Sequence, residues 1–277
     1  MRIGIDVAQH QLGWEELVGR VRFAEEAGFD GAWLFDHFKP MFGDAEGPCF
    51  EAYTALAALA ATTTRIRLGV LVTGVTYRHP SVFAAEAITI DHVSGGRLEL
   101  SLGAAWFEEE HTELGVPFPP TAERADRLEE AIEVVKALMT TDGATVEGRH
   151  YHLHDATLRP RPVQQPHPPL WIGAGGHQRT IPIAARHADV WHSFGSVETL
   201  TAKAAVLDTH ARRAGRDPGD IVRATSLSLS EPWDEVRATA AELADAGFSY
   251  LVASWPDQGR PRVEEFVERV LPDLEAR

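Results

Sequence analysis

The first candidate for chemistry is the pair Asp36–His37, which follows an apolar run over residues 31–35. Such a run is typical of a short buried strand, and this one ends in an acid and an imidazole. Because buried charge is costly unless it is paired or used, a strand end of this kind often opens onto a functional site. An Asp–His pair is also a common structural hydrogen bond. Whether this pair is catalytic or structural depends on which groups surround it.

A second candidate is Gly173-Ala174-Gly175-Gly176-His177, which follows an apolar strand and precedes a helix. Small residues allow backbone N–H groups to approach an anion, and the N-terminus of a helix favours phosphate. A tight turn that simply needs glycine is the plainer interpretation, since the spacing is not that of the Rossmann fingerprint. We expect a phosphate site in this segment, because barrels often form one from late strand-end loops.

Two further groups of polar residues carry weaker signals. His150, His152 and His154 alternate, so on a strand they would share one face, but they lie between a helix and a proline-rich stretch. We expect a solvated hairpin there and no metal site. The acidic run 108–110 follows Trp106 and is most simply a solvated loop or helix start, although one of its carboxylates could face a site.

The chain that must position these residues alternates between short apolar runs and helical stripes. The runs predict strands at residues 3–6, 33–35, 67–73, 98–102, 170–173, 189–193, 221–229 and 250–254. Helices are expected at residues 14–27, 49–61, 80–93, 121–139, 179–186, 197–214, 233–246 and 262–274. Strands joined by crossover helices pair in parallel, and eight of them favour an α/β fold closed into a (β/α)8 TIM barrel over a doubly wound sheet.

The segment between the fourth and fifth predicted strands interrupts this alternation. Residues 107–120 are acidic and proline-rich, and residues 142–168 combine an extended, hairpin-like stretch with a run of prolines. We therefore expect one barrel domain over residues 1–277 with an insertion made of these two segments. In such a barrel the chemistry lies at the carboxyl ends of the strands, which would bring Asp36–His37 and the glycine-rich segment to the same mouth.

Composition limits the function further. The 277 residues carry a formal net charge of −15, which argues against nucleic acid or an anionic membrane surface as a partner. The longest apolar stretches are too short to span a bilayer, and residues 1–6 enter a strand without a signal-peptide pattern. The single Cys49 excludes an intramolecular disulfide and a cysteine zinc site. We expect a cytoplasmic, acidic, globular protein.

Several motifs spread over residues 3–191 are together typical of a known family. In chain order they are Gly28-Phe29-Asp30-Gly31-Ala32-Trp33, Asp36-His37-Phe38, Arg67-Leu68-Gly69-Val70-Leu71-Val72-Thr73 with Tyr77-Arg78-His79-Pro80, Ser94-Gly95-Gly96-Arg97-Leu98, Gly103 with Trp106, and Trp171-Ile172-Gly173-Ala174-Gly175-Gly176. The chain resembles the luciferase-like monooxygenase superfamily, and within it the oxidoreductases that depend on the deazaflavin coenzyme F420. The set is specific to the superfamily and moderately specific for F420 over FMN.

The resemblance implies a (β/α)8 barrel with an inserted segment before strand five. It implies that His37 lies beside the hydride-carrying carbon of the cofactor. Asp36 would hold the cofactor's hydroxylated side chain or the tautomer of the histidine. A bulge with a non-prolyl cis peptide is implied at Val70–Leu71, against the rear face of the ring, with Thr73 as a polar contact.

Further contacts are expected around the same cofactor. Trp106 is expected beside the cofactor, and the glycine-rich turn would take its phosphate. Phe38, Met41 and Trp255 are expected as apolar walls of the substrate pocket. Pairing into a homodimer through barrel helices is also implied.

Two positions depart from the sugar-phosphate dehydrogenases of the superfamily. Met41 stands where they have a tryptophan, and Trp106 stands where they have a catalytic glutamate. The sequence also has no late cluster of lysine and arginine suited to a substrate phosphate. We expect hydride transfer between F420 and a small, largely apolar organic substrate, with the second proton donor left open. An FMN-dependent monooxygenase, a non-catalytic F420 carrier and a metal-dependent barrel hydrolase are the alternatives.

Overall fold

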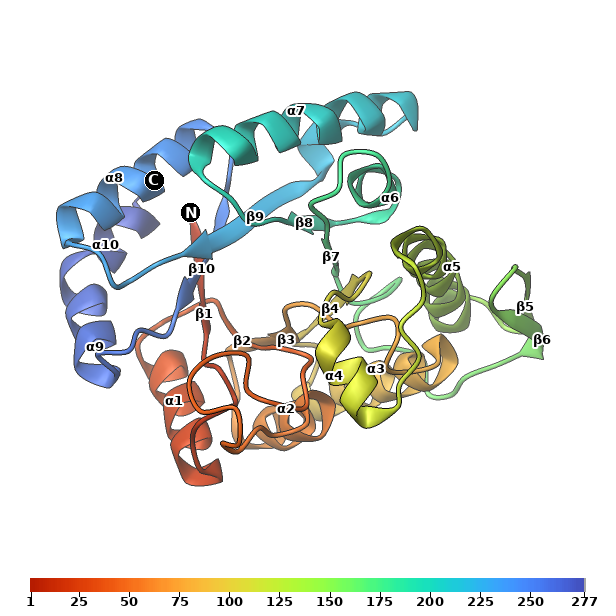
Figure 1. Ribbon diagram of the computed structural model, residues 1–277, viewed down its shortest axis with the longest axis horizontal. Coiled ribbons are helices and arrows are strands. Elements are labelled where there is room, and N and C mark those ends of the chain that lie inside the picture. Colours follow the sequence, from red (N-terminus) through yellow and green to blue (C-terminus); the bar gives the residue numbers. More distant parts are fainter. Residues whose placement is uncertain (277) are drawn as a thin grey trace.

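The apolar runs pair with one another into a closed wall. The computed structural model describes residues 1–276, and within them eight parallel strands form a barrel in the order β1-β10-β9-β8-β7-β4-β3-β2 (Figure 1). The strands are β1 (Arg2–Asp6), β2 (Gly31–Leu34), β3 (Arg67–Val70), β4 (Leu98–Gly103), β7 (Leu170–Gly173), β8 (Val190–His192), β9 (Val222–Leu227) and β10 (Tyr250–Ser254). The predicted (β/α)8 barrel is therefore confirmed.

Helices connect the strands, because each connecting segment carries an apolar stripe that packs on the outside of the barrel. They are α1 (Trp14–Glu26), α2 (Ala52–Thr62), α3 (Pro80–Ser94), α5 (Thr121–Thr140), α6 (Thr180–His187), α7 (Val197–Arg213), the 3-10 turn η1 (Pro218–Asp220), α8 (Trp233–Asp245) and α9 (Arg260–Arg269). The last predicted helix is divided, since α9 is followed by a separate α10 (Leu271–Glu275). Within residues 1–276 no helix is both long and apolar enough to cross a bilayer.

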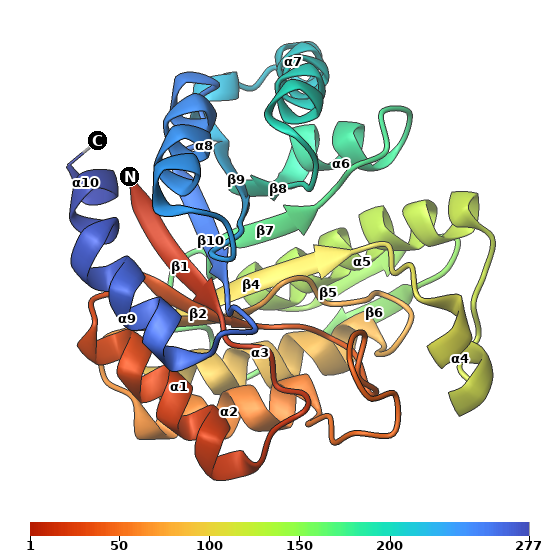
Figure 2. The same cartoon turned by 60° about the vertical axis from the view of Figure 1, so that its left-hand side comes forward.

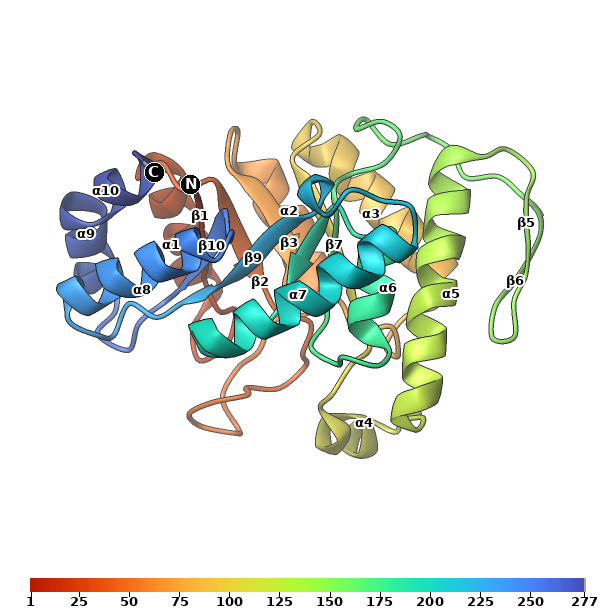
Figure 3. The same cartoon turned by 90° about the horizontal axis from the view of Figure 1, so that it is seen from above.

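The interruption between β4 and β7 holds two elements outside the barrel wall. Helix α4 (Glu108–Leu114) occupies the acidic segment, and β5 (Ala144–Glu147) pairs antiparallel with β6 (His152–Ala156). Figures 1 and 3 show this hairpin beyond α5, on the side away from the barrel. The side chains of His152 and His154 are exposed on it, and residues 1–276 contain no group of three potential metal ligands. His152 and His154 thus lie on a solvated hairpin, whereas His150 precedes β6 and is half-buried.

The mouth of the barrel lies on the side of α4. Figure 2 shows β4 and β7 pointing toward that side. The parallel register pairs Gly173 with both Gly103 and His192, so these strand ends lie at one level. The loop after β2 reaches the same end, because the amine of Lys39 donates to Glu113 of α4 at 2.7 Å.

Large aromatic rings fill the barrel interior below the mouth. Trp33, Trp171 and Tyr250 are fully buried, with ring centroids 4.3 Å apart for the two tryptophans and 4.9 Å for Trp171 and Tyr250. Gly69 is required beside them, since a Cβ there would lie 2.3 Å from Cζ3 of Trp33. The interior is a packed core, so a ligand can be held only above it, at the mouth.

We expect Gly69→Ala to destabilise the barrel by about 1–3 kcal/mol, because the new methyl group would collide with the enclosed ring of Trp33. Urea denaturation followed by circular dichroism measures the free energy of unfolding. The matched control is Gly19→Ala in α1, where an added Cβ meets nothing within 4 Å in the described chain beyond the helix's own backbone. That change should stabilise by about 0.5–1 kcal/mol. Equal stability of the two variants would contradict the close packing at Gly69.

Candidate active site

His37 lies at the mouth, just beyond the end of β2, and is enclosed by aromatic rings. The centroids of Phe35, Trp106 and Phe107 each lie 5.6 Å from that of the imidazole. Only 8% of His37 is exposed, whereas Trp106 is 64% exposed and stacks on Phe107. The structure therefore brings two of the predicted site residues, His37 and Trp106, together at one edge of the mouth.

A buried carboxylate holds this imidazole. Glu110 of α4 is 0% exposed, and its Oε2 lies 3.1 Å from Nδ1 of His37. Its Oε1 accepts from the N–H groups of Phe38 at 2.6 Å and Lys39 at 3.0 Å, and its Oε2 also accepts from the hydroxyl of Tyr77. Burial acts to raise the pKa of Glu110, but hydrogen bonds from His37, Tyr77 and Phe38 bring that pKa below its usual value. The carboxylate thus accepts from three donors of the chain and has the imidazole of His37 as its fourth hydrogen-bonding partner.

Asp36 has different partners from its neighbour His37. Its two carboxylate oxygens each accept from Nη1 of Arg78 at 2.8 Å, and Oδ2 also accepts from the N–H of Gly74 at 2.9 Å. Burial raises the pKa of Asp36, while Arg78 and the Gly74 N–H act against that shift. The expectation that Asp36 sets the tautomer of His37 is wrong, because Glu110 makes the Nδ1 contact. Its contact with the cofactor stays a prediction.

A non-prolyl cis peptide is present near the end of β3, but one bond later than expected. It joins Leu71 to Val72, and Val70 is a regular, fully buried residue of β3. The side chain of Val72 lies against the ends of β4 and β7. A Cβ added to Gly103 or Gly173 would be 2.5 Å or 2.6 Å from its Cγ2. The placement at Val70–Leu71 is therefore wrong by one residue, and Val72 is the side chain that these glycines accommodate.

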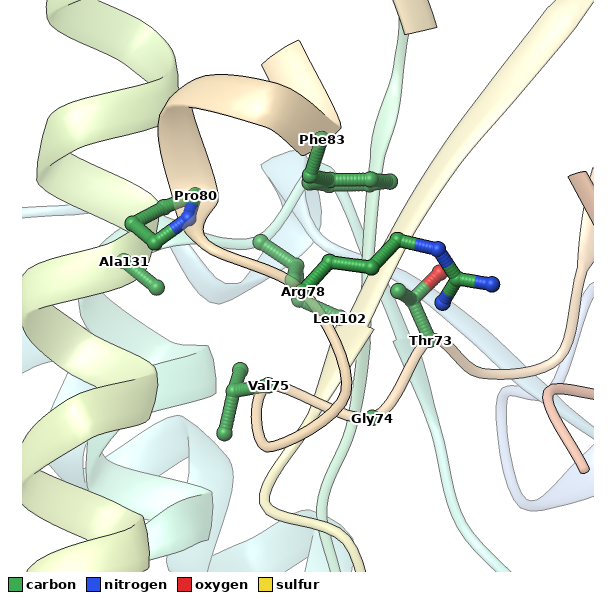
Figure 4. Close-up of a pocket in the computed structure, with 8 residues that line it drawn as sticks. All are labelled: Thr73, Gly74, Val75, Arg78, Pro80, Phe83, Leu102 and Ala131. Atoms are coloured by element: carbon green, nitrogen blue, oxygen red, sulfur yellow. The ribbon is translucent and has the colours of Figure 1, made fainter. Parts of the chain in front are cut away.

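Thr73 is not available at the mouth. It is 1% exposed, and its hydroxyl contacts that of Tyr53 and lies 3.3 Å from Oγ of Ser101. Figure 4 shows it with Arg78 and Phe83 around a void of about 10 Å³ on the helix side of the strands. Such a void holds at most one water molecule. The expectation of Thr73 as a polar contact of a cofactor is wrong, because its hydroxyl is bonded inside the protein.

The glycine-rich turn after β7 reaches the mouth with its tip in solvent. Gly175, Gly176 and His177 are exposed, and Ala174 is buried beneath them. Helix α6 begins at Thr180, whose hydroxyl accepts from the N–H of Gly176 at 2.9 Å. Within residues 1–276 the N–H groups of Gly175 and His177 donate to no protein acceptor. Both are backbone donors that an anion could use.

A lysine amine lies beside this turn. Lys203 of α7 donates to Oγ of Ser193 at 3.2 Å and to the carbonyl of Phe194 at 2.7 Å. A Cβ added to Gly175 would be 3.5 Å from the same amine. A cation next to free backbone N–H groups is suited to a phosphate. Sequence reasoning missed Lys203, because it lies within a helix and belongs to no motif.

Two titratable groups end other strands of the barrel, β1 and β8. Asp6 ends β1 and accepts from the N–H of Ala8 at 2.9 Å, and burial raises its pKa to about 6. His192 ends β8, is 1% exposed, and has its pKa lowered to about 3 by burial. Its Nε2 has no hydrogen-bond partner in the described chain. Register pairs Asp6 with Trp33 and His192 with Gly173, so both belong to the inward-facing set of side chains.

Two of the expected pocket walls lie elsewhere. Trp255 packs on α1, where the guanidinium of Arg20 lies 4.5 Å from its ring centroid. Phe38 packs edge-on against Tyr77 at 5.0 Å between centroids and lines a groove along α2 and α3. The expectation that Trp255 and Phe38 wall the substrate pocket is therefore wrong. Met41 is half-buried in the loop after β2, and its role stays a prediction.

Comparison with known proteins identifies the family. The sequence profile of the luciferase-like monooxygenases matches residues 1–265. The chain belongs to this family. It is 36% identical to an F420-dependent glucose-6-phosphate dehydrogenase of Microbacterium testaceum, over 97% of this chain and 88% of that one. It is 34% identical to the protein of the same name from Kineococcus radiotolerans, over 87% of this chain and 71% of that one. In structure this luciferase-like barrel is similar to an F420-dependent secondary alcohol dehydrogenase, with a TM-score of 0.88 and 19% identity over 99% of this chain and 98% of that one.

We expect Asp6→Asn to stabilise this luciferase-like barrel at pH 7.5 but not below pH 4. The folded pKa of Asp6 is about 6, against 3.8 as the usual value, so the unfolded chain ionises first and wild-type stability falls as pH rises through that window. Asn carries no such cost and should gain about 1–3 kcal/mol at pH 7.5. Urea denaturation at both pH values measures the difference. An equal effect at the two pH values would contradict the raised pKa.

Proposed function

We propose that the protein is an oxidoreductase that transfers a hydride between coenzyme F420 and a small organic substrate. The observation that carries this proposal is the enclosed imidazole of His37 at the barrel mouth, held by Glu110 and bordered by Trp106 and Phe107. It is supported by the relatives at 34% and 36% identity, which are named for F420-dependent dehydrogenation.

The residues at the mouth fit such a cofactor. Its phosphate would be held by the N–H groups of Gly175 and His177 and by the amine of Lys203. The buried Nε2 of His192, without a partner in residues 1–276, is available to a polar atom of a bound ring. When bound, the deazaflavin supplies the carbon that accepts or gives the hydride. The protein binds and orients it, excludes water with Trp106 and its neighbours, and manages the accompanying proton.

The substrate that we propose is neutral and largely apolar, in contrast to the sugar phosphate in the names of the two relatives. Trp106 and Phe194, at the ends of β4 and β8, are 64% and 65% exposed and give the mouth an apolar rim. The amine of Lys203 lies at the glycine turn, where it would pair with the phosphate of the cofactor. A second phosphate would therefore meet rings rather than a cation.

We also propose that the whole chain is one barrel domain carrying residues 107–120 and 142–168 as insertions. The first insertion contributes to the mouth, because its helix α4 supplies Glu110. The second forms the β5–β6 hairpin beyond α5.

Two copies of the chain are proposed to pair along α2 and α3. A groove of about 660 Å³ runs between these helices. Ala57, Ala85 and Ile90 line it together with the charged side chains of Glu51, Arg78 and Glu86. Val82 on its rim is 53% exposed. Sedimentation equilibrium distinguishes this dimer from a monomer.

We expect Lys203→Met to weaken F420 binding by about 5- to 30-fold, because it removes the cation beside the phosphate turn. Fluorescence titration of the purified protein with F420 measures the dissociation constant. A deazaflavin that lacks the phosphate should bind the variant and the wild type equally. The matched control is Lys39→Met, whose amine pairs with Glu109 and Glu113 on the surface of α4 and should leave binding unchanged.

The same titration tests the choice of cofactor. Tight binding of FMN without measurable binding of F420, oxidised or reduced, would contradict the proposed function in favour of an FMN-dependent monooxygenase. Binding of F420 with no hydride transfer over a broad panel of alcohols, aldehydes and ketones would favour a carrier.

We expect His37→Ala to slow hydride transfer by about 100-fold or more while leaving F420 binding and the barrel intact, because general acid–base catalysis contributes at least that much. Stopped-flow absorbance of the deazaflavin measures the step. Circular dichroism and thermal unfolding check the fold. An unchanged rate would exclude a catalytic role of His37.

A further inference from the structure

We propose that Glu110 is a positioning residue, which fixes the proton of His37 on Nδ1 so that Nε2 offers its lone pair to the barrel mouth. The catalytic role of this tautomer rests on the proposed function. The tautomer itself depends only on the protein and can be measured without the cofactor. The two side chains come from segments 73 positions apart, the end of β2 and helix α4.

The hydrogen bonds of Glu110 leave one assignment for its two oxygens. Oε1 accepts from the backbone N–H groups of Phe38 and Lys39, at 2.6 Å and 3.0 Å, and a backbone N–H can only donate. Oε2 is left to His37 Nδ1 at 3.1 Å and to the hydroxyl of Tyr77. An ionised carboxylate accepts and cannot donate, so Nδ1 must carry the hydrogen. A neutral imidazole with its hydrogen on Nδ1 has its lone pair on Nε2.

Glu110 acts through His37 and not on a substrate. It is 0% exposed, whereas the side chain of His37 keeps about a tenth of its surface open beside Trp106. The neighbouring acids of α4 face solvent, and Glu109 pairs with the amine of Lys39 on the surface. The acidic run therefore supplies no second acid to the pocket. Its one buried member is a partner of the imidazole.

This arrangement allows His37 to accept the hydroxyl proton that the substrate loses during hydride transfer. When an alcohol is oxidised, its C–H bond breaks with the electron pair and reduces the cofactor, and its O–H bond breaks to leave a carbonyl. The hydroxyl proton forms a new bond to Nε2, and the resulting imidazolium is stabilised by the adjacent carboxylate of Glu110. In the reverse direction Nε2 returns the proton to the carbonyl oxygen. A histidine with the hydrogen already on Nε2 could not accept it.

The test is Glu110→Gln, which should reverse the tautomer. The glutamine carbonyl oxygen must take the Oε1 position, because the N–H groups of Phe38 and Lys39 still need an acceptor. Its NH₂ group then replaces Oε2 and donates to Nδ1 of His37, which places the imidazole hydrogen on Nε2. Nitrogen-15 NMR of histidine-labelled protein reads the tautomer directly, and His37→Ala identifies the signal among the 13 histidines.

We expect wild-type His37 in the Nδ1–H form and Glu110→Gln in the Nε2–H form, with kcat lower by at least about 100-fold and F420 binding unchanged. Glu109→Gln is the matched control and should alter neither signal nor rate. Tyr77→Phe keeps the carboxylate and should retain the Nδ1–H form, with kcat lower by less than about tenfold.

An Nε2–H form in the wild type would overturn the proposal, and this measurement does not require that the variant folds. A reversed tautomer with full activity would show that Glu110 sets the tautomer but that the tautomer does not matter for catalysis. Because the NMR spectra are recorded without cofactor, failure of F420 to bind would leave the tautomer result standing and would count only against the proposed function.

Discussion

The barrel mouth depends on the enclosed carboxylate of Glu110. Its four donors come from two separate places, the end of β2 and, through Tyr77, the loop that leads into α3, while Glu110 itself sits on α4. A buried charge with this many donors is costly to leave partly satisfied, so the segments that provide them are held in one arrangement. The same contact that closes α4 over the barrel also orients the imidazole of His37. Glu110 therefore contributes both to the stability of the mouth and to the orientation of its imidazole.

Strand alternation explains why a second buried carboxylate, one residue before His37, has another role. Successive side chains of an extended chain point to opposite sides, and just beyond β2 Asp36 and His37 meet different neighbours. Asp36 is drawn to Arg78 and to the N–H of Gly74, which ties the end of β2 to the segment after β3. The imidazole is then free to face the aromatic rings. An Asp–His sequence motif here encodes two separate contacts and not a hydrogen-bonded pair.

Sequence periodicity was sufficient for the barrel, because apolar runs and helical stripes report burial directly and crossover helices leave parallel pairing as the consequence. It also brought His37, Trp106 and the glycine turn to one mouth. Sequence periodicity missed features that depend on which way side chains point at the strand ends and on contacts between residues far apart in the sequence. The cis peptide near the end of β3 was predicted one bond too early, so Leu71 was named where Val72 faces the strand ends. The chain turns outward after β10, so Trp255 packs on α1 and not in the mouth. Glu110 and Lys203 carry no local motif, so only folding reveals that one reaches His37 and the other the turn at Gly175.

The distribution of charge at the mouth reconciles an acidic protein with an anionic cofactor. A net charge of −15 repels a phosphate at long range, but that repulsion is screened within about 8–10 Å at physiological salt. At contact distance a phosphate would meet Lys203 and free N–H groups, while the carboxylates of Asp36 and Glu110 are already paired with donors of their own. Buried His192 adds no charge, since its low pKa keeps it neutral. Affinity for the anion is thus local, and the rest of the surface can remain acidic without opposing it.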